Sequence, residues 1–397
     1  MGGQEASALR RANTRVVVEQ LREGGATSRA GLARDTGLAK QTVSTIVAAL
    51  LTDGVVRELG SVRAESGGGR PAVLVAYAAD RAFVAALELG VGRTRLVIAD
   101  ALGEPVQTQE VPHEPHAARP AAKVLADVVA RLAQVMEGIG GLVLLRAVGV
   151  SVTGLVQPTS GRCVLAPNLG WRDVPVADLL RRALARRGCD VPVVVRGAAQ
   201  SSLIAEHREG AATGQRDVVL LFEDEGVGAA IIEAGRLLDG ADGTAGELGH
   251  CAWPGADARC GCGRRGCVET LASGPAVRRA VERATGRRVR RRDGEPTYAA
   301  LARRDDPEVA EAAAEAGRVL GTAASWLTAV TAPRMVVLSG SLVLAPVALR
   351  TALVQVLCDR SLADAPPLVV AGVLGDGAAV RGAVLLALDE ARRVRRL

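Results

Sequence analysis

The chain has 397 residues, of which 49% are hydrophobic and only 2% aromatic, so its core must be built mainly from Ala, Val, Leu and Ile. The formal net charge of +6 permits a nucleic-acid partner without requiring one. The sequence has neither the pattern of a secretory signal nor an uninterrupted apolar run of membrane-spanning length, so we expect no membrane partner and a cytoplasmic protein. Seven cysteines, four of them clustered, fit a reducing compartment.

The first part of the chain predicts three short helices. Helical spacing of apolar residues predicts a helix over residues 8–24 that ends at the Gly24–Gly25 pair. Ser28 is placed to cap a second helix, Arg29–Thr36. Gly37 supplies the turn to a third, from about Lys40 to Thr52. The buried stripe predicted for the first helix is Leu9, Ala12, Val16, Val17 and Leu21.

The third helix has two contrasting faces. Its apolar face is Val43, Ile46, Val47, Leu50 and Leu51. Its polar face is Lys40, Gln41, Thr42, Ser44 and Thr45. Two short helices joined by a glycine turn predict a helix-turn-helix whose second helix enters the major groove of DNA. The alternative is a small helical bundle with a solvated polar face.

A strand pattern and a glycine-rich segment follow these helices. Apolar alternation begins at Gly54, and residues 63–71 have the composition of a hairpin tip. This order of elements predicts a winged helix-turn-helix DNA-binding domain over residues 1–75, with arginines of the wing in the minor groove. The candidate DNA contacts are Arg29, Lys40, Gln41, Thr42, Ser44, Thr45, Arg63 and Arg70.

The remaining chain, residues 76–397, predicts an α/β domain. Paired strands followed by strand–helix alternation occur twice, which is typical of two lobes with a ligand cleft between them. The predicted strands are Phe83–Leu89, Thr94–Ala99, Ala147–Thr153, Val191–Val195, Asp217–Leu221, Gly228–Ile232, Arg334–Leu338 and Leu368–Val370. The predicted helices are 119–137, Val174–Arg187, Ala198–Glu209, 274–285, 297–304, 307–330, Pro346–Leu357 and Ala378–Arg393.

Residues 246–269 predict a structural zinc loop. Glycines alternate with the cysteines and let the backbone fold tightly around one point. Three thiolates and one imidazole complete a tetrahedral zinc site and leave no position for an activated water, which disfavours a zinc hydrolase. The predicted metal ligands are His250, Cys260, Cys262 and Cys267.

These motifs together resemble the ROK family (repressors, open reading frames and kinases), in its transcriptional-regulator branch, over essentially the whole chain. The matching segments are Ser28–Gly37, Thr42–Ser44, Gly68–Pro71, Ala166–Trp171, Gly226–Gly228, Gly246–His250 and Cys260–Glu269. The resemblance implies a winged helix-turn-helix ahead of a two-lobed actin-like, RNase H-like sugar-kinase fold. It also implies that residues 76–397 form a ligand-sensing and oligomerisation domain.

The sequence departs from the kinase members at three places. The resemblance implies an Asn-Asp pair, with the Asp as base, where Gly197 and Ala198 stand. The segment Glu88–Gly92 replaces an Asp-x-Gly-x-Thr phosphate motif, and Ser339–Ser341 replaces a Gly-Gly pair. Losing a positioned base typically costs about 10²- to 10⁴-fold in rate. We therefore expect a degenerate kinase with no catalytic residue.

Four residues of the implied ligand cleft remain: Asn168, Glu247, His250 and Glu269. Asn168 has the alternative role of capping its loop, and Glu269 that of an acid at a helix N-terminus. His250 would serve both zinc and the cleft, which would link ligand binding to the shape of the loop.

The sequence thus predicts a sequence-specific DNA-binding transcriptional regulator, a repressor of carbohydrate-related genes. Its implied partners are a double-stranded DNA operator and a sugar or sugar-derivative effector, and its implied assembly is a homodimer or homotetramer. The alternative is an ATP-dependent sugar kinase with an added DNA-binding domain.

Overall fold

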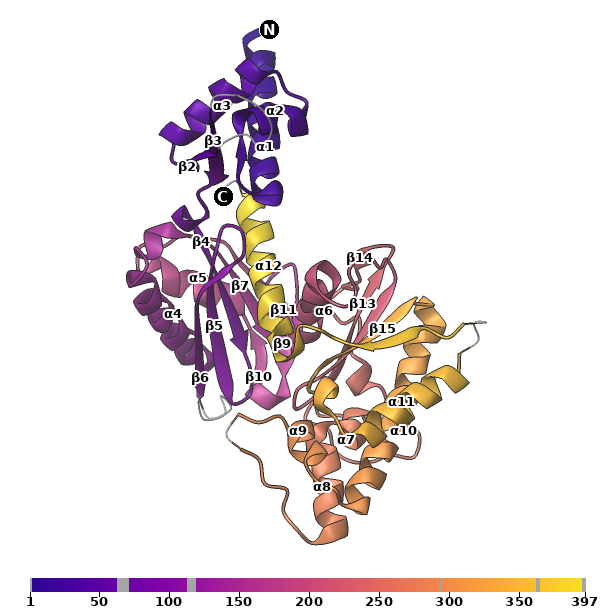
Figure 1. Cartoon of the computed structure of the whole chain (residues 1–397). Coiled ribbons are helices and arrows are strands. Elements are labelled where there is room, and N and C mark those ends of the chain that lie inside the picture. Colours follow the sequence, from indigo (N-terminus) through magenta and orange to yellow (C-terminus); the bar gives the residue numbers. More distant parts are fainter. Residues whose placement is uncertain (1, 63–70, 113–118, 293, 362–364, 395–397) are drawn as a thin grey trace. The chain divides into compact units, whose positions relative to one another are not determined.

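The computed structural model describes residues 2–62, 71–112, 119–292, 294–361 and 365–394. The chain divides into two compact units, residues 1–83 with 100–104, and residues 84–99 with 105–397 (Figure 1). Strand β3 (Ala72–Tyr77) crosses residue 75, where the sequence placed the domain boundary. The predicted wing residues Arg63 and Arg70 lie outside the described residues.

The first unit contains three helices followed by a strand pair. The helices are α1 (Gly2–Gly24), α2 (Arg29–Thr36) and α3 (Lys40–Thr52). Strands β1 (Thr27–Ser28), β3 and β2 (Val56–Val62) form an antiparallel sheet in the order β1-β3-β2. This is the order of elements expected of a winged helix.

The sequence signals around α2 and α3 are confirmed. Ser28 caps α2, since its Oγ accepts a hydrogen bond from the Gly31 N–H at 3.1 Å. Gly37 has a φ of 69°, the left-handed conformation that glycine adopts without steric cost. The residues of α3 predicted to be buried are buried, except Leu51, which is half-buried.

The stripe predicted for α1 is wrong in its first half. Val17 and Leu21 are buried, whereas Leu9 and Val16 are 64% and 42% exposed, and Ala12 is exposed too. At roughly 100° per residue, Leu9, Ala12 and Val16 share one helix face, while Val17 and Leu21 lie on the next. Only the second face packs into the small core of the first unit.

The second unit is built on two five-stranded sheets. The first, in the order β11-β7-β4-β5-β6, consists of β4 (Phe83–Leu89), β5 (Arg93–Asp100), β6 (Pro105–Pro112), β7 (Leu145–Val152) and β11 (Val193–Gly197). The second, in the order β14-β13-β12-β15-β16, consists of β12 (Val218–Glu223), β13 (Val227–Glu233), β14 (Arg236–Leu237), β15 (Met335–Gly340) and β16 (Leu368–Ala371).

A small antiparallel sheet, which the sequence did not predict, also belongs to this unit. Its strands are β8 (Leu155–Gln157), β9 (Arg162–Ala166) and β10 (Trp171–Val174). Three to five residues are too few to establish a period of two. The edge strand β6 was also missed, because its four central residues, 107–110, are all polar and it begins and ends in Pro.

Helices cover both sheets and establish the α/β class. They are α4 (Ala121–Glu137), α5 (Val176–Ala185), α6 (Ala198–Glu209), α7 (Glu269–Ala272), α8 (Gly274–Thr285), α9 (Thr297–Ala302), α10 (Pro307–Thr331), α11 (Val347–Asp359) and α12 (Ala378–Arg393). Among the described helices, none combines the length and apolarity that a membrane crossing needs.

Helix α12 packs on β7 and on α6, and glycines make both contacts close (Figure 1). A Cβ on Gly382 would overlap the carbonyl oxygen of Ser201 in α6. A Cβ on Gly149 in β7 would overlap the carbonyl oxygen of Ala383. The backbones therefore approach more closely at these two points than any side chain allows.

We predict that Gly382→Ala destabilises the second unit by about 1–3 kcal/mol, because the added methyl group forces α12 away from α6. The matched control is Gly377→Ala, at a glycine with negative φ and open space around its Cβ position. Urea unfolding followed by circular dichroism measures both variants. Equal transition midpoints for the two would contradict the close packing.

Candidate functional site

The polar face of α3 presents several side chains to solvent in the first unit. Lys40, Gln41 and Thr45 are exposed, and Thr42 and Ser44 are half-buried. The Thr45 hydroxyl donates a hydrogen bond to the backbone carbonyl oxygen of Gln41 at 2.9 Å. The side-chain amide of Gln41 takes no part in this bond.

Arg29, another candidate DNA contact, lies at the start of α2. Its guanidinium forms an ion pair with Glu58 of β2 at 3.0 Å. Both side chains are partly exposed, so this pair is weak and a phosphate can compete for Arg29. Sequence spacing gave no sign of the pair, because 29 residues separate its members.

The four predicted ligand residues line one cavity of about 550 Å³ in the second unit. Asn168 lies in the turn η4 (Pro167–Leu169), His250 ends the turn η5 (Leu248–His250), and Glu269 begins α7. Glu247 directly precedes η5. The first turn of α6 and the β12–β13 hairpin line the same cavity.

Asn168 and Glu269 also hold the cavity wall together. The Glu269 Oε2 accepts a hydrogen bond from the Val227 N–H at 3.1 Å, and the Asn168 amide donates to the Glu225 carbonyl oxygen at 3.5 Å. Both contacts reach the β12–β13 hairpin. Each residue therefore has a structural contact and, in addition, a surface on the cavity.

The donor atoms of His250, Cys260, Cys262 and Cys267 lie within 4.8 Å of one another. The Cys262 and Cys267 sulfurs are 3.7 Å apart, as are the His250 Nδ1 and the Cys260 sulfur. The edge of a tetrahedron with metal–sulfur bonds of 2.3 Å is about 3.8 Å. The cluster therefore fits a tetrahedrally bound metal ion.

Burial and the neighbouring Glu247 affect the donor groups of this cluster. Burial raises the pKa of the Cys260 and Cys267 thiols, because a thiolate loses hydration there. A metal ion supplies the charge that stabilises thiolates. The Nε2 of His250 lies 4.0 Å from the Glu247 carboxylate, so the imidazole connects the metal cluster to the cavity.

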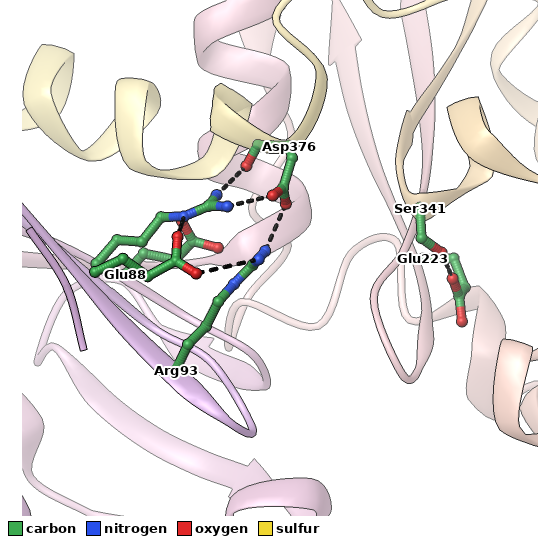
Figure 2. A network of polar contacts seen from close by, with 7 residues as sticks. Glu88, Arg93, Glu223, Ser341 and Asp376 are labelled. Carbon is green, nitrogen blue, oxygen red and sulfur yellow. Dashed lines mark hydrogen bonds and ion pairs between the residues drawn. The ribbon is translucent and has the colours of Figure 1, made fainter. Parts of the chain in front are cut away.

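A cluster of charged side chains occupies the end of β4 and β5, where the resemblance placed a phosphate motif. Arg95 pairs with Glu110 at 2.8 Å, with Glu88 at 3.4 Å, and with Asp376 before α12 (Figure 2). Arg93 also pairs with Asp376. Burial raises the pKa of Glu88 to about 7, although Arg95 and Arg93 lower it. Carboxylates of the chain itself therefore hold both arginines.

The β12–β13 turn carries three consecutive acids. Glu223 is buried and accepts hydrogen bonds from the Gly274 N–H at 2.8 Å and from the Ser341 hydroxyl (Figure 2). Burial raises the pKa of both Glu223 and Asp224, and Asp224 lines the cavity. Glu225 pairs with Arg291 at 2.7 Å. Of these three acids, Asp224 alone is part of the cavity lining.

The first turn of α6 carries no acid. Gly197 is its N-cap residue, and both Gly197 and Ala198 line the cavity. Gln200, which follows in the same turn, lines it too. The sequence drew no attention to Gln200 or to Asp224, because neither belongs to a motif that predicts a site.

Comparison with known protein families identifies the family of this chain. A sequence profile described as "ROK family" matches residues 84–390. The chain belongs to the ROK family. It is 26% identical over 278 residues to a protein named xylose repressor from Bacillus spizizenii, a match that covers 69% of each chain.

Two solved structures show the breadth of the ROK fold. One is a ROK family transcriptional regulator described as a homologue of the Escherichia coli MLC protein, with a TM-score of 0.73, 23% identity and 98% of each chain covered. The other is a ROK family glucokinase from Streptomyces griseus in complex with glucose and AMPPNP. It has a TM-score of 0.64 and 26% identity, and the match covers 77% of this chain and 99% of that one.

We predict that the purified chain carries one metal ion and that Cys262→Ser lowers this content severalfold, because a ligand is lost. Cys251→Ser is the matched control, since Cys251 is an exposed thiol next to the cluster but outside it. Elemental analysis after gel filtration gives the metal content of each chain. Equal content in the two variants would rule out the four-donor site.

Proposed function

We propose that this ROK family protein is a sequence-specific DNA-binding transcriptional regulator that represses genes of carbohydrate use. One observation carries the proposal: residues ahead of the ROK-matched segment 84–390 fold as three helices and a strand pair, with a polar, cationic face on α3. The similarity to a protein named xylose repressor supports the same function.

The proposed DNA contacts follow from where side chains lie on α3. Gln41 carries both a donor and an acceptor and is suited to read an adenine edge, while Lys40 is suited to a phosphate. Arg29, Thr42, Ser44 and Thr45 lie around these two, and Arg63 and Arg70 complete the proposed set from the wing.

A regulator of this kind acts as a symmetric oligomer on a symmetric site. We propose a homodimer or homotetramer through residues 76–397, with 1–75 as the DNA-binding domain. Two-fold symmetry then requires a pseudo-palindromic operator whose half-sites are about one or more helical turns apart.

Two features of the chain disfavour the kinase alternative. Ala198 stands where the kinase resemblance requires the base, and a methyl group cannot accept a proton. Arg93 and Arg95, which lie where the kinase resemblance places the phosphate motif, are already paired with Asp376. We therefore propose a degenerate kinase that binds an effector without transferring phosphate to it.

Zinc is the metal that suits the cluster best. Three thiolates and one imidazole in a tetrahedron are a common structural zinc set. The ion would fix the positions of His250, Glu247 and Glu269 around the cavity and supply no chemistry to a substrate. Asn168, Glu247, His250 and Glu269 are then the proposed effector contacts.

An effector would act by binding one conformation of the protein more tightly than another. A sugar or sugar derivative in the cavity contacts both the α6 wall and the wall that contains the metal loop. Its differential affinity for the two conformations sets how far the DNA affinity can change.

We predict that Gln41→Ala reduces the preference for one base at one operator position by about 1–3 kcal/mol of binding free energy. Lys40→Ala should lower the affinity for all DNA sequences alike and reduce the slope of log K against log salt concentration by about 1. Lys123→Ala is the control, because Lys123 is the other lysine of the chain and is exposed on α4.

Gel shifts of the upstream promoter region at several salt concentrations measure all three variants. If no variant differs from the unmodified protein, or if the protein binds DNA without sequence preference at physiological salt, the proposed function is wrong.

A further inference from the structure

The positive charge of the chain is concentrated in one short stretch of the second unit, residues 278–293, which we call the arginine segment. It contains eight arginines and two acids, a net charge of +6, which equals the formal net charge of the whole chain. The other residues therefore have no net charge in sum. Residues 1–75, which contain the helix-turn-helix, carry ten basic and seven acidic side chains.

The arginine segment begins on α8 and continues along the loop toward α9 (Figure 1). Arg279 and Arg283 are exposed four residues apart on α8, so they lie on one face of the helix. Gly286 ends α8 with a φ of 67° and turns the chain into the loop. The arginines of the segment that we consider below are exposed on α8 and on this loop: Arg279, Arg283, Arg287, Arg288, Arg290 and Arg292.

Two residues hold the loop part of the segment in place. Val289 is buried in the core of the second unit, and its N–H donates a hydrogen bond to the Glu282 Oε1 at 2.9 Å. Arg291 donates to the Glu295 carbonyl oxygen at 2.8 Å and pairs with Glu225 at 2.7 Å. The exposed arginines between and beside these residues are therefore carried on an ordered backbone, which lowers the entropy cost of binding a partner.

The six exposed guanidinium groups have no ion pair or hydrogen bond with other described residues. The acids that follow in the chain, Glu295 and Asp306, are already paired with Arg303 and Arg304. The dipole of α8 stabilises a charge in its last turn, which accounts for Arg283 and not for the others. Like charges so close in sequence repel one another, and a partner with many negative charges relieves this repulsion.

The composition of the arginine segment favours one kind of polyanion. Guanidinium groups match the geometry of phosphate oxygens. Single-stranded nucleic acids are held by stacking on aromatic side chains, and the segment has none. A membrane surface requires exposed apolar side chains, but both valines of the segment, Val281 and Val289, are buried. Double-stranded DNA presents a dense row of phosphates and needs neither feature.

We propose that the arginine segment binds the phosphate backbone of double-stranded DNA, as a second DNA contact outside the winged helix. Phosphate contacts carry no sequence information, so the segment raises the affinity for all duplexes alike. The proposed regulator function does not require this surface, because base recognition is assigned to α3. The segment adds an affinity that depends strongly on salt, which the small charge excess of residues 1–75 provides only weakly.

Fluorescence anisotropy of a labelled random-sequence duplex, titrated with the full chain at several salt concentrations, tests the proposal. The triple variant Arg287→Gln, Arg288→Gln, Arg290→Gln removes three unpaired charges. It should lower the affinity about 10-fold or more at roughly 0.1 M salt and reduce the slope of log K against log salt concentration by about 2–3. Lysine at the same three positions should keep most of the slope, because an ammonium group also binds phosphate.

The matched control removes three exposed arginines that are spread over α4, β14 and α10: Arg131→Gln, Arg236→Gln, Arg318→Gln. It changes the net charge of the chain by the same amount, so it separates a local contact from an effect of total charge. Its slope should differ from that of the unmodified chain by less than about 1. Thermal unfolding should be similar in all variants, because exposed substitutions rarely alter stability.

The affinity for the promoter region relative to that for the random duplex separates this proposal from the regulator function. The arginine variant should leave this ratio within about twofold, because phosphate contacts do not distinguish sequences. A chain that binds the random duplex through the arginine segment but shows no preference for the promoter region would contradict the regulator function and support the present proposal.

Equal salt slopes for the arginine variant and the dispersed control would overturn the proposal. Tighter binding of the unmodified chain to a single strand of the same length, or to phosphatidylserine vesicles, than to the duplex would also overturn it.

Discussion

The carboxylate of Glu269 joins the two structures on which the cavity depends. One oxygen accepts a hydrogen bond from the Val227 backbone N–H of the β12–β13 hairpin, and the other lies 3.5 Å from the Cys260 sulfur of the metal cluster. The metal loop and the sheet edge are therefore held at a fixed spacing by one side chain. We propose that a metal ion bound by the four donors would make the loop rigid and so fix the shape of the cavity wall.

We propose that the cavity binds a ligand without catalysing a reaction. The ROK fold is shared with a glucokinase in complex with glucose and AMPPNP, but fold alone does not determine activity. In this chain the first turn of α6 carries the side-chain amide of Gln200 and no carboxylate. Proton transfer would require a carboxylate at this position. Outside the cavity lining, Arg93 and Arg95 are paired with carboxylates of the chain itself. The remaining polar groups are suited to hold a ligand.

Local signals predicted the parts of this structure that depend on local chemistry. The bounds of α2 and α6 agree with the sequence, and capping by Ser28 and the turn at Gly37 follow from their residue types. The four metal donors also came from spacing alone, because a short glycine-rich loop has few ways to fold. Nearby residues in sequence determine each of these features.

Features that depend on distant residues were not predictable from the sequence. The Arg95–Asp376 pair joins residues 281 positions apart, and the short strands β8–β10 are defined only by their pairing. Leu9 and Val16 of α1 are exposed because the small core of the first unit contacts only the helix face with Val17 and Leu21. Gln200 belongs to no motif, and only the folded chain places it in the cavity lining.

Nuclease footprinting of the DNA upstream of the protein's own gene tests the central claim most directly. With the metal-loaded full chain and excess competitor DNA, the account predicts protection of two segments related by two-fold symmetry and separated by whole helical turns. Uniform protection, or none above that of the competitor, would contradict a sequence-specific regulator.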